Sequence, residues 1–373
     1  MSVSRGGKFD YPLLIVTAGL TLFGILMVYS ASSYYSLLTY GNEFNYMYKQ
    51  VFGVVAGLIV MFALTMLDYR LLIKFRWAIL GVGIILLAIV LIPGVGIEIY
   101  GARRWLNLGF ITLQSSEVAK FAYIIFVAAY MAKNYKKMTS LKTVLPIVAV
   151  GIVICALIML EPNMSVTMCV IILMLGLLFV GGMRMKYFVL SVIPVLALVA
   201  VLIIIEPYRL ARLFAFINPW ASPLDEGYQL IQSYYALGSG GFFGIGLFNS
   251  RQKYLFLPFA ESDFIFSIIG EELGLLGCII TIAAFCFMIF RIIRAAQNAA
   301  DRFGMYLCGG IAMLIGIQVL INIAVVTGSI PPTGIPLPFI SSGSSSLIVF
   351  CGGIGIVQSV SLRSHASVRA LGG

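Results

Sequence analysis

Two carboxylates stand at the start of a long apolar segment, within the stretch Phe259-Ala-Glu-Ser-Asp-Phe-Ile-Phe266. If the segment that follows crosses a membrane, Glu261 and Asp263 lie where water meets lipid. A carboxylate at that boundary can take a proton from a membrane-anchored substrate, and so act as a general base. Asp263 could instead be a helix N-cap, because Asp accepts hydrogen bonds from the free N–H groups of a first turn.

Basic side chains form a second group of candidates. Arg103 and Arg104 are adjacent in a loop that also contains Gly and Asn. Guanidinium groups match phosphate oxygens bidentately, so this pair could hold a phosphate. The alternative is interfacial anchoring, with Trp105 in an aromatic belt. Arg212 and Lys253 in the long loop before Asp263 are further candidates for phosphate contact.

Several charged residues lie inside apolar segments and need partners. Glu117 and Lys120 have i,i+3 spacing, which places them on one helix face as an ion pair. They could fix the helix, line a polar cavity, or do both. Glu271 and Glu272 lie about 12–14 Å into the helix that follows Asp263, and the bland interpretation is pairing with basic residues.

The segment Pro331–Ser346 is apolar but contains four prolines, which preclude a regular helix. Irregular backbone at membrane depth must be buried in protein or line a cavity. We therefore expect a re-entrant element beside Asp263 rather than a surface loop. Within it, Ser342 and Ser345 offer hydroxyl groups to a substrate.

The elements that position these residues follow from composition. Apolar residues make up 61% of the chain and charged residues 10%, well below the soluble norm of about 25%. Uncharged stretches long enough to span a bilayer recur along the chain. We predict an all-α, polytopic integral membrane protein, one domain over residues 1–373, with ten transmembrane helices near 11–31, 48–67, 75–93, 113–132, 142–160, 163–182, 187–205, 263–290, 303–327 and 344–362.

Charge distribution sets the orientation. If both termini are cytoplasmic, two thirds of the 24 Lys and Arg residues fall on the cytoplasmic side, as the positive-inside rule expects. The outer loops are then about 94–112, 206–262 and 328–343, and the second of these, between helices 7 and 8, is the largest. This bias also argues against nucleic acid as the partner of a +10 chain. The scattered Cys and the lone His365 argue against a disulfide framework or a His-containing metal site.

Three motifs in order give the chain a family resemblance. They are Gly101-Ala-Arg-Arg-Trp-Leu-Asn-Leu-Gly109 with Gln114-Ser-Ser-Glu-Val-Ala-Lys120, Phe259-Ala-Glu-Ser-Asp-Phe-Ile-Phe266 with Gly270-Glu-Glu-Leu-Gly274, and Thr333-Gly-Ile-Pro-Leu-Pro-Phe-Ile-Ser341. Together they resemble the SEDS family (shape, elongation, division and sporulation), and its FtsW/SpoVE branch most. Two blocks depart from the family pattern, at Glu161-Pro-Asn-Met-Ser165 and Ser341-Ser-Gly-Ser-Ser-Ser346, but neither includes Asp263 or the arginines.

The resemblance implies a peptidoglycan glycosyltransferase that polymerises lipid II in the bacterial cytoplasmic membrane, for cell division or spore cortex synthesis, with Asp263 as the essential acid. It implies a class B penicillin-binding protein as partner, together with other divisome or sporulation proteins. No cofactor is required by the residues, although a divalent cation, Mg²⁺ or Mn²⁺, is compatible with a pyrophosphate substrate. Two other functions stay open: a lipid II flippase, and a non-catalytic scaffold that recruits a transpeptidase.

Overall fold

The computed structural model describes residues 7–99, 102–107, 109, 112–193 and 207–364. Helices dominate this part of the chain. In order they are α1 (Tyr11–Tyr40), α2 (Asn45–Met66), α3 (Leu71–Val90), α4 (Ser115–Asn134), η1 (Tyr135–Lys137), α5 (Leu141–Leu160), α6 (Met164–Val180), α8 (Pro207–Ile217), η2 (Pro219–Ala221), α9 (Tyr228–Gly240), α10 (Ile265–Gln297), α11 (Arg302–Val326) and α12 (Ser344–Leu362).

Local signals set several helix boundaries. Asp10 caps α1, because its Oδ1 accepts a hydrogen bond from the Leu13 N–H (3.0 Å). Gly41 ends that helix in the left-handed region (φ 68°), which glycine adopts without steric cost. Asp301 caps α11 in the same way through the Gly304 N–H (2.8 Å). Between such caps the residues are almost all apolar, so each helix can lie in lipid.

Eight helices of the described residues are long and apolar enough to cross a membrane, namely α1 to α5, α10, α11 and α12. They match eight of the ten predicted segments, although α1 and α10 extend well beyond their predicted ends. The sixth segment is the apolar helix α6, which at 17 residues is shorter than the others. The seventh, 187–205, is helical up to residue 193 and otherwise lies outside the described residues.

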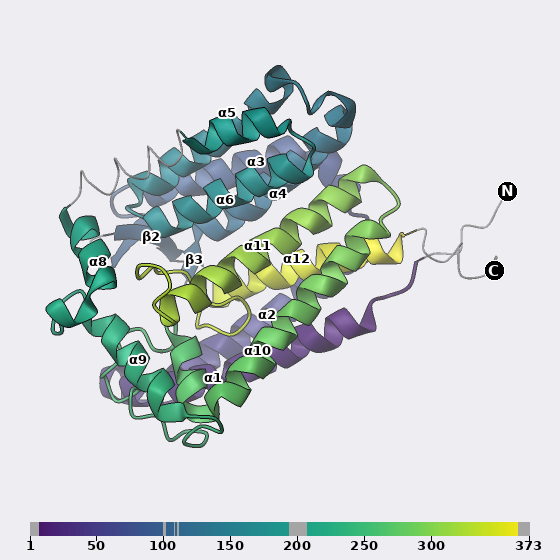
Figure 1. The fold of residues 1–373 in the computed structure, drawn as a ribbon. Helices are drawn as coiled ribbons and strands as arrows, with labels where there is room; N and C mark the ends of the chain where they lie inside the picture. The colour runs from purple at the N-terminus through teal and green to yellow at the C-terminus, as the bar shows by residue number, and fades with distance from the viewer. Residues whose placement is uncertain (1–6, 100–101, 108, 110–111, 194–206, 365–373) are drawn as a thin grey trace.

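The helices form a bundle in which the start of α1 and the end of α12 lie at the same end (Figure 1). α11 and α12 run through the middle, between a group made of α3 to α6 and a group made of α1, α2 and α10 (Figure 1). α8, α9 and the strands lie at the opposite end of the bundle from the termini (Figure 1). The elements that carry the candidate site residues therefore gather at that opposite end.

The expectation of a purely helical chain is wrong at residues 94–112. This predicted loop carries most of a three-stranded antiparallel sheet, made of β1 (Gly96–Ile99), β2 (Ala102–Asn107) and β3 (Thr112–Gln114). Trp105 faces Gln114 across the β2–β3 pair, and β3 leads directly into α4. The backbone N–H and C=O groups of a loop packed on the protein need hydrogen-bond partners, and strand pairing supplies these partners within the loop. The large loop 206–262 is likewise structured, since it holds α8, η2 and α9.

Two turns into α10 the helix is broken at Gly274, whose backbone is non-helical (φ 66°, ψ −164°). The Gly-rich segment 241–246 fills the break with backbone hydrogen bonds. Its Ile245 and Gly246 N–H groups donate to the carbonyls of residues 271 and 272 (3.0 Å each). Its residues 241 and 242 in turn accept from the N–H groups of Leu275 and Leu276 (2.9 and 3.1 Å). The outer loop is thus hydrogen-bonded into the helix that follows it.

Candidate active site

Asp263 stands just before α10 and does not cap it. The N-cap is Phe264, and its side chain makes no capping hydrogen bond to α10. The hydrogen bond that the Asp263 carboxylate accepts among the described residues comes from Ser262 Oγ (3.0 Å). Burial raises the pKa of Asp263 to about 6, against the opposing effects of Ser262 and the positive charges of Arg104 and Arg212. This carboxylate is therefore available as a base at neutral pH.

The irregular segment between α11 and α12 lies against Asp263, as the sequence predicted. A Cβ built on Gly334 would be 3.2 Å from Asp263 Oδ2, so the backbone of this segment forms a wall of the site. Asn322 of α11 fixes both sides, since its Nδ2 donates to the carbonyls of Asp263 and Ile335 (2.8 Å each). The prolines keep this segment out of helix, and side chains of other elements satisfy its backbone groups.

Two further bonds hold the segment to the carboxylate motif. Ser341 Oγ donates to the carbonyl of Ser262 (2.6 Å), and the Ser342 N–H donates to the carbonyl of Glu261 (2.8 Å). Glu261 is therefore anchored through its backbone while its side chain is partly buried. Burial and the neighbouring charge of Asp263 raise the pKa of Glu261. The side chain of Ser342 is partly exposed beside this pair.

The arginines divide into two kinds. Arg104, on β2, and the exposed Arg212, on α8, both lower the pKa of Asp263, so their charges act on the same space. Arg104 is held in place, because its guanidinium donates to the carbonyls of Glu161 (3.1 Å) and Pro162. Arg103 instead forms a partly exposed ion pair with Glu98 across the sheet (2.8 Å). The charges of Arg104 and Arg212 thus reach Asp263, whereas Arg103 pairs with Glu98 on the sheet.

Glu161 is a residue whose contribution the sequence interpretation missed. Its carboxyl is fully buried at the turn between α5 and α6, where Oε1 accepts from Ser115 Oγ (3.0 Å). Burial raises the pKa of Glu161 to about 8, although Ser115 and Arg104 oppose the rise. At neutral pH the side chain is therefore mostly protonated. Glu161 also accepts a hydrogen bond from Arg104 through its backbone carbonyl. It therefore connects α4, the α5–α6 turn and β2 beside the site.

Two predicted substrate contacts are placed differently by the structure. Lys253 is 6% exposed, and its Nζ donates to the carbonyl of Phe248 and lies 3.7 Å from Glu272 Oε1. Its charge thus neutralises a buried acid instead of facing a substrate. Ser345 is also 6% exposed, and its Oγ accepts from the Gln114 N–H (3.3 Å). We therefore remove Lys253 and Ser345 from the substrate-binding group.

The predicted ion pair on α4 is confirmed as a contact. Lys120 Nζ lies 2.7 Å from Glu117 Oε1, and both side chains are buried. Two charges at this depth need each other, because neither has water to solvate it. Glu117 Oε2 has no hydrogen-bond partner among the residues that the structure describes. The pair lies within the first two turns of α4, which begins at Ser115.

The arrangement can perform one kind of chemistry well. A carboxylate with free acceptor capacity can take a proton from a hydroxyl group. Guanidinium groups nearby can stabilise a phosphate that departs with negative charge. The described residues contain no group of three or more metal-ligating side chains. The site therefore suits a displacement in which a hydroxyl attacks and a phosphate ester leaves.

Comparison with known proteins gives a consistent result. The family model for FtsW, RodA and SpoVE, described as a cell cycle protein, matches residues 11–366. The probable peptidoglycan glycosyltransferase FtsW of Coxiella burnetii is 39% identical over 363 residues, which are 96% of this chain and 97% of that protein. Stage V sporulation protein E of Bacillus subtilis is 38% identical over 358 residues, or 95% and 98% of the two chains.

Solved structures show the same fold. A chain from a peptidoglycan synthase complex that coordinates polymerization and crosslinking superposes with a TM-score of 0.77 at 26% identity, and covers 95% of this chain and 98% of that one. The rod shape determining protein RodA of Thermus thermophilus superposes with a TM-score of 0.69 at 24% identity, over 95% and 97% of the two chains.

Proposed function

Because this chain belongs to the FtsW/RodA/SpoVE family of multi-pass membrane proteins, we propose that it is a peptidoglycan glycosyltransferase that polymerises lipid II. The proposed product is a β-1,4-linked glycan strand, with release of undecaprenyl pyrophosphate. Relatives named for cell-wall polymerisation and for sporulation are almost equally similar. The proposal therefore covers both cell division and spore cortex synthesis.

One observation carries the proposal. Asp263 stands outside its helix with its carboxylate uncommitted to capping, within the field of Arg104 and Arg212 and against the backbone of Gly334. A structural aspartate at a helix start would bond to the first turn. A carboxylate that is free of capping, has a raised pKa and lies within the field of two cations is what a general base for a phosphate-activated substrate needs.

The proposed reaction is a single displacement. Asp263 accepts the proton of the acceptor sugar's 4-hydroxyl, and the hydroxyl oxygen attacks the anomeric carbon of the donor. The bond from that carbon to the pyrophosphate oxygen breaks, and the pyrophosphate leaves with the electron pair. Arg104 and Arg212 stabilise the negative charge that develops there. One displacement converts the α-linked donor into a β-linkage, so one base suffices and no covalent sugar–enzyme intermediate is needed.

A divalent cation, Mg²⁺ or Mn²⁺, is a separate proposal. Mg²⁺ is usually held by one or two carboxylates together with substrate phosphates rather than by a protein cage. Glu261 could provide such a carboxylate while the pyrophosphate provides the remaining oxygens. Under this proposal the metal arrives with the substrate. Polymerisation should then stop with EDTA and resume with added Mg²⁺ or Mn²⁺.

The membrane placement and the partner complete the proposal. We place the chain in the bacterial plasma membrane with ten spans and both termini in the cytoplasm, so that the end with Asp263 faces outward. The similar chain from a peptidoglycan synthase complex supports a class B penicillin-binding protein as the partner transpeptidase. Cysteine labelling at the termini and at Ser342 would test the orientation.

The decisive experiment uses purified protein with lipid II. Asp263→Asn keeps the size of the side chain and removes the base, so polymerisation should fall by at least about 100-fold. Asp225→Asn is the matched control, because Asp225 is an exposed acid in the same outer loop.

The alternatives give different results in the same preparation. Lipid II movement across liposomes without polymer would indicate a flippase, and neither activity would indicate a scaffold. Normal polymer from Asp263→Asn would remove Asp263 as the base.

A further inference from the structure

A shallow cleft of about 390 Å³ lies far from Asp263, at the end of the bundle that carries the termini. It is lined by Thr139, Ser140, Leu141, Lys142, Arg184 and Tyr187. α5 connects the two regions, since it begins beside the cleft and ends at Glu161. At 1.5 Å per residue its 20 residues separate the cleft from the candidate active site by about 30 Å. The cleft is therefore a distinct place on the molecule.

The two cations of the cleft are exposed and unneutralised. Lys142 and Arg184 form no ion pair or side-chain hydrogen bond within the described part of the chain. The sequence around them is basic, because Glu161, at the far end of α5, is the only acid between residues 118 and 205. Four further lysines flank the cleft in sequence: Lys133, Lys136, Lys137 and Lys186. The cleft therefore combines two free cations with a strongly positive surrounding sequence.

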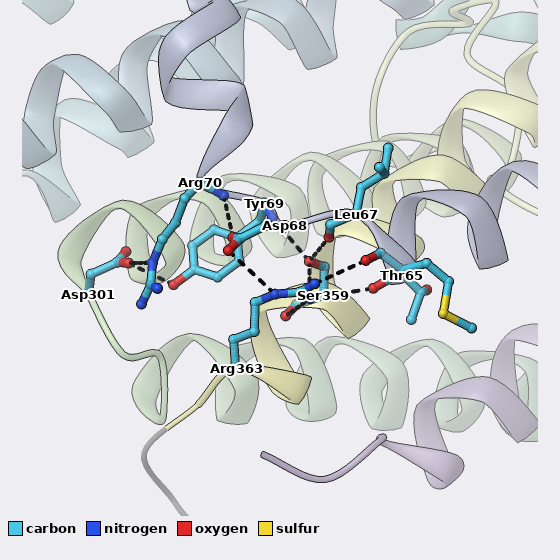
Figure 2. Close-up of polar contacts among 9 residues, drawn as sticks. Thr65, Leu67, Asp68, Tyr69, Arg70, Asp301, Ser359 and Arg363 are labelled. Atoms are coloured by element: carbon cyan, nitrogen blue, oxygen red, sulfur yellow. Dashed lines mark hydrogen bonds and ion pairs between the residues drawn. The ribbon is translucent and has the colours of Figure 1, made fainter. Parts of the chain in front are cut away.

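Three other arginines at this end of the bundle are neutralised by acids. Figure 2 shows Arg70 on Asp301, and Arg363 beside Asp68 and the carbonyls that end α2. Arg291 likewise pairs with Asp10 (2.8 Å). These ion pairs join neighbouring helix ends, so the arginines in them have a structural role. Lys142 and Arg184 have no such role, so their charges are available to a ligand.

Apolar side chains continue from the cleft along both helices that border it. Leu141 and Leu145, one turn apart on α5, are 52% and 62% exposed. Met185 and Val189, one turn apart in the helical stretch 185–193, are 61% and 52% exposed. In a membrane such faces contact acyl chains. The region is cationic at the membrane boundary and apolar toward the bilayer. An anionic lipid has the matching arrangement, with a negative head group and apolar acyl chains.

We propose that this cleft binds the phosphate head group of an anionic phospholipid in the leaflet on the side of the termini. Lys142 and Arg184 contact the phosphate, since charge-assisted bonds to phosphate oxygens are strong and Arg binds them bidentately. Thr139 and Ser140 add hydroxyl donors. The acyl chains lie along the exposed faces of α5 and residues 185–193. Basic pockets between helices on the cytoplasmic side of membrane proteins bind anionic lipids in this way. The inference uses the proposed membrane orientation and is independent of Asp263.

The test measures lipid retention by the full-length protein in detergent, using native mass spectrometry with phosphatidylglycerol and, separately, phosphatidylcholine. The cleft variant is Lys142→Gln/Arg184→Gln. Its affinity for phosphatidylglycerol should fall by roughly tenfold or more, because each bond to a charged group contributes about that factor. The matched control is Lys74→Gln/Arg294→Gln, which removes the same charge from exposed positions at the same end of the bundle.

Each outcome decides the proposal. Selective loss of phosphatidylglycerol in the cleft variant, with the control unchanged, supports it. An equal loss in both double variants would reduce the effect to general charge and overturn the site. Retention of phosphatidylcholine as strongly as phosphatidylglycerol by the unaltered protein would remove the head-group recognition. Inorganic phosphate that binds as tightly as phosphatidylglycerol would identify a free-phosphate site and overturn the lipid assignment. All four residues are exposed, and unchanged thermal unfolding verifies that both variants fold.

Discussion

Gly334→Ala tests whether the irregular segment supports the base. The added Cβ would stand 3.2 Å from Asp263 Oδ2. That distance is a few tenths of an ångström shorter than an ordinary carbon contact, which favours about 3.5–4.0 Å. The carboxylate must therefore shift by that amount, since the Asn322 bonds to both backbones limit how far the segment itself can retreat. The backbone of Gly334 is not in the left-handed region, so alanine is not strained there.

The magnitude follows from the cost of misplacing a reacting group. A displacement of 1 Å costs about 100-fold in rate, so a shift of 0.3–0.5 Å should cost roughly four- to tenfold. The methyl group also adds an apolar contact to the Asp263 carboxylate, which should raise its pKa above about 6. Because the base must be deprotonated, the acidic limb of the pH–rate profile should move to higher pH. Both quantities come from polymerisation of lipid II by purified enzyme, measured across pH.

A glycine in the neighbouring helix provides the matched control. Gly309 lies in α11, and a Cβ there would meet nothing within 4 Å. Gly309→Ala should therefore leave both the rate and the pH profile unchanged. If Gly334→Ala behaved like Gly309→Ala in both measurements, the segment would not contact the reacting carboxylate, and the reasoning would fail.

Four further predictions concern buried or half-buried polar groups. Asp263→Asn should raise the thermal unfolding temperature in detergent at pH 7. A pKa raised from 3.8 to about 6 lowers the free energy of unfolding by up to about 3 kcal/mol, and this loss disappears as pH falls below 4. An unchanged unfolding temperature would contradict the raised pKa. Neutralising Glu117 or Lys120 alone should cost roughly 3–5 kcal/mol of stability. We expect strong coupling in a double-mutant cycle, and additive effects of the two substitutions would show that the side chains do not touch. Glu161→Gln should preserve activity near neutral pH, because the carboxyl is mostly protonated there. Glu161→Ala should reduce stability by about 1–3 kcal/mol. Equal effects of the Gln and Ala variants on activity and stability would contradict this. Cys at Ser342 should react with a polar thiol reagent from outside and be protected by lipid II, and labelling from the cytoplasm would refute the orientation.

The sequence was a good guide where a local pattern decides the structure. Uncharged runs identified the helices, because spanning length and composition are local properties. The prolines from Pro331 onward identified the irregular segment for the same reason. The sheet was missed, because strands of three to six residues inside a loop carry little periodicity. The close approach of Gly334 to Asp263 joins segments far apart in the chain, and no local signal contains it.

Lys253 shows why the predicted side of the membrane is by itself a weak argument for the function of a basic residue. Its position in an outer loop predicted an available charge, yet the loop folds back and the ammonium meets Glu272. The signal for this pairing was present in the sequence, since two adjacent acids inside an apolar helix require a basic partner. Arg103 is a milder case, because its partner Glu98 lies only five residues away. A cation is a substrate candidate only after the acids within reach have been assigned.

The break in α10 at Gly274 affects how the chain enters the membrane. The segment 241–246 is synthesised before residues 271–276, so in the proposed orientation it would reach the outer side of the membrane first. Each unpaired backbone group in hydrocarbon costs several kcal/mol, and four bonds close this break. The part of α10 before Gly274 is therefore joined to the rest of the helix through bonds that the docked segment 241–246 supplies. Shortening residues 241–246 should thus lower the yield of inserted protein before any effect on turnover can be measured.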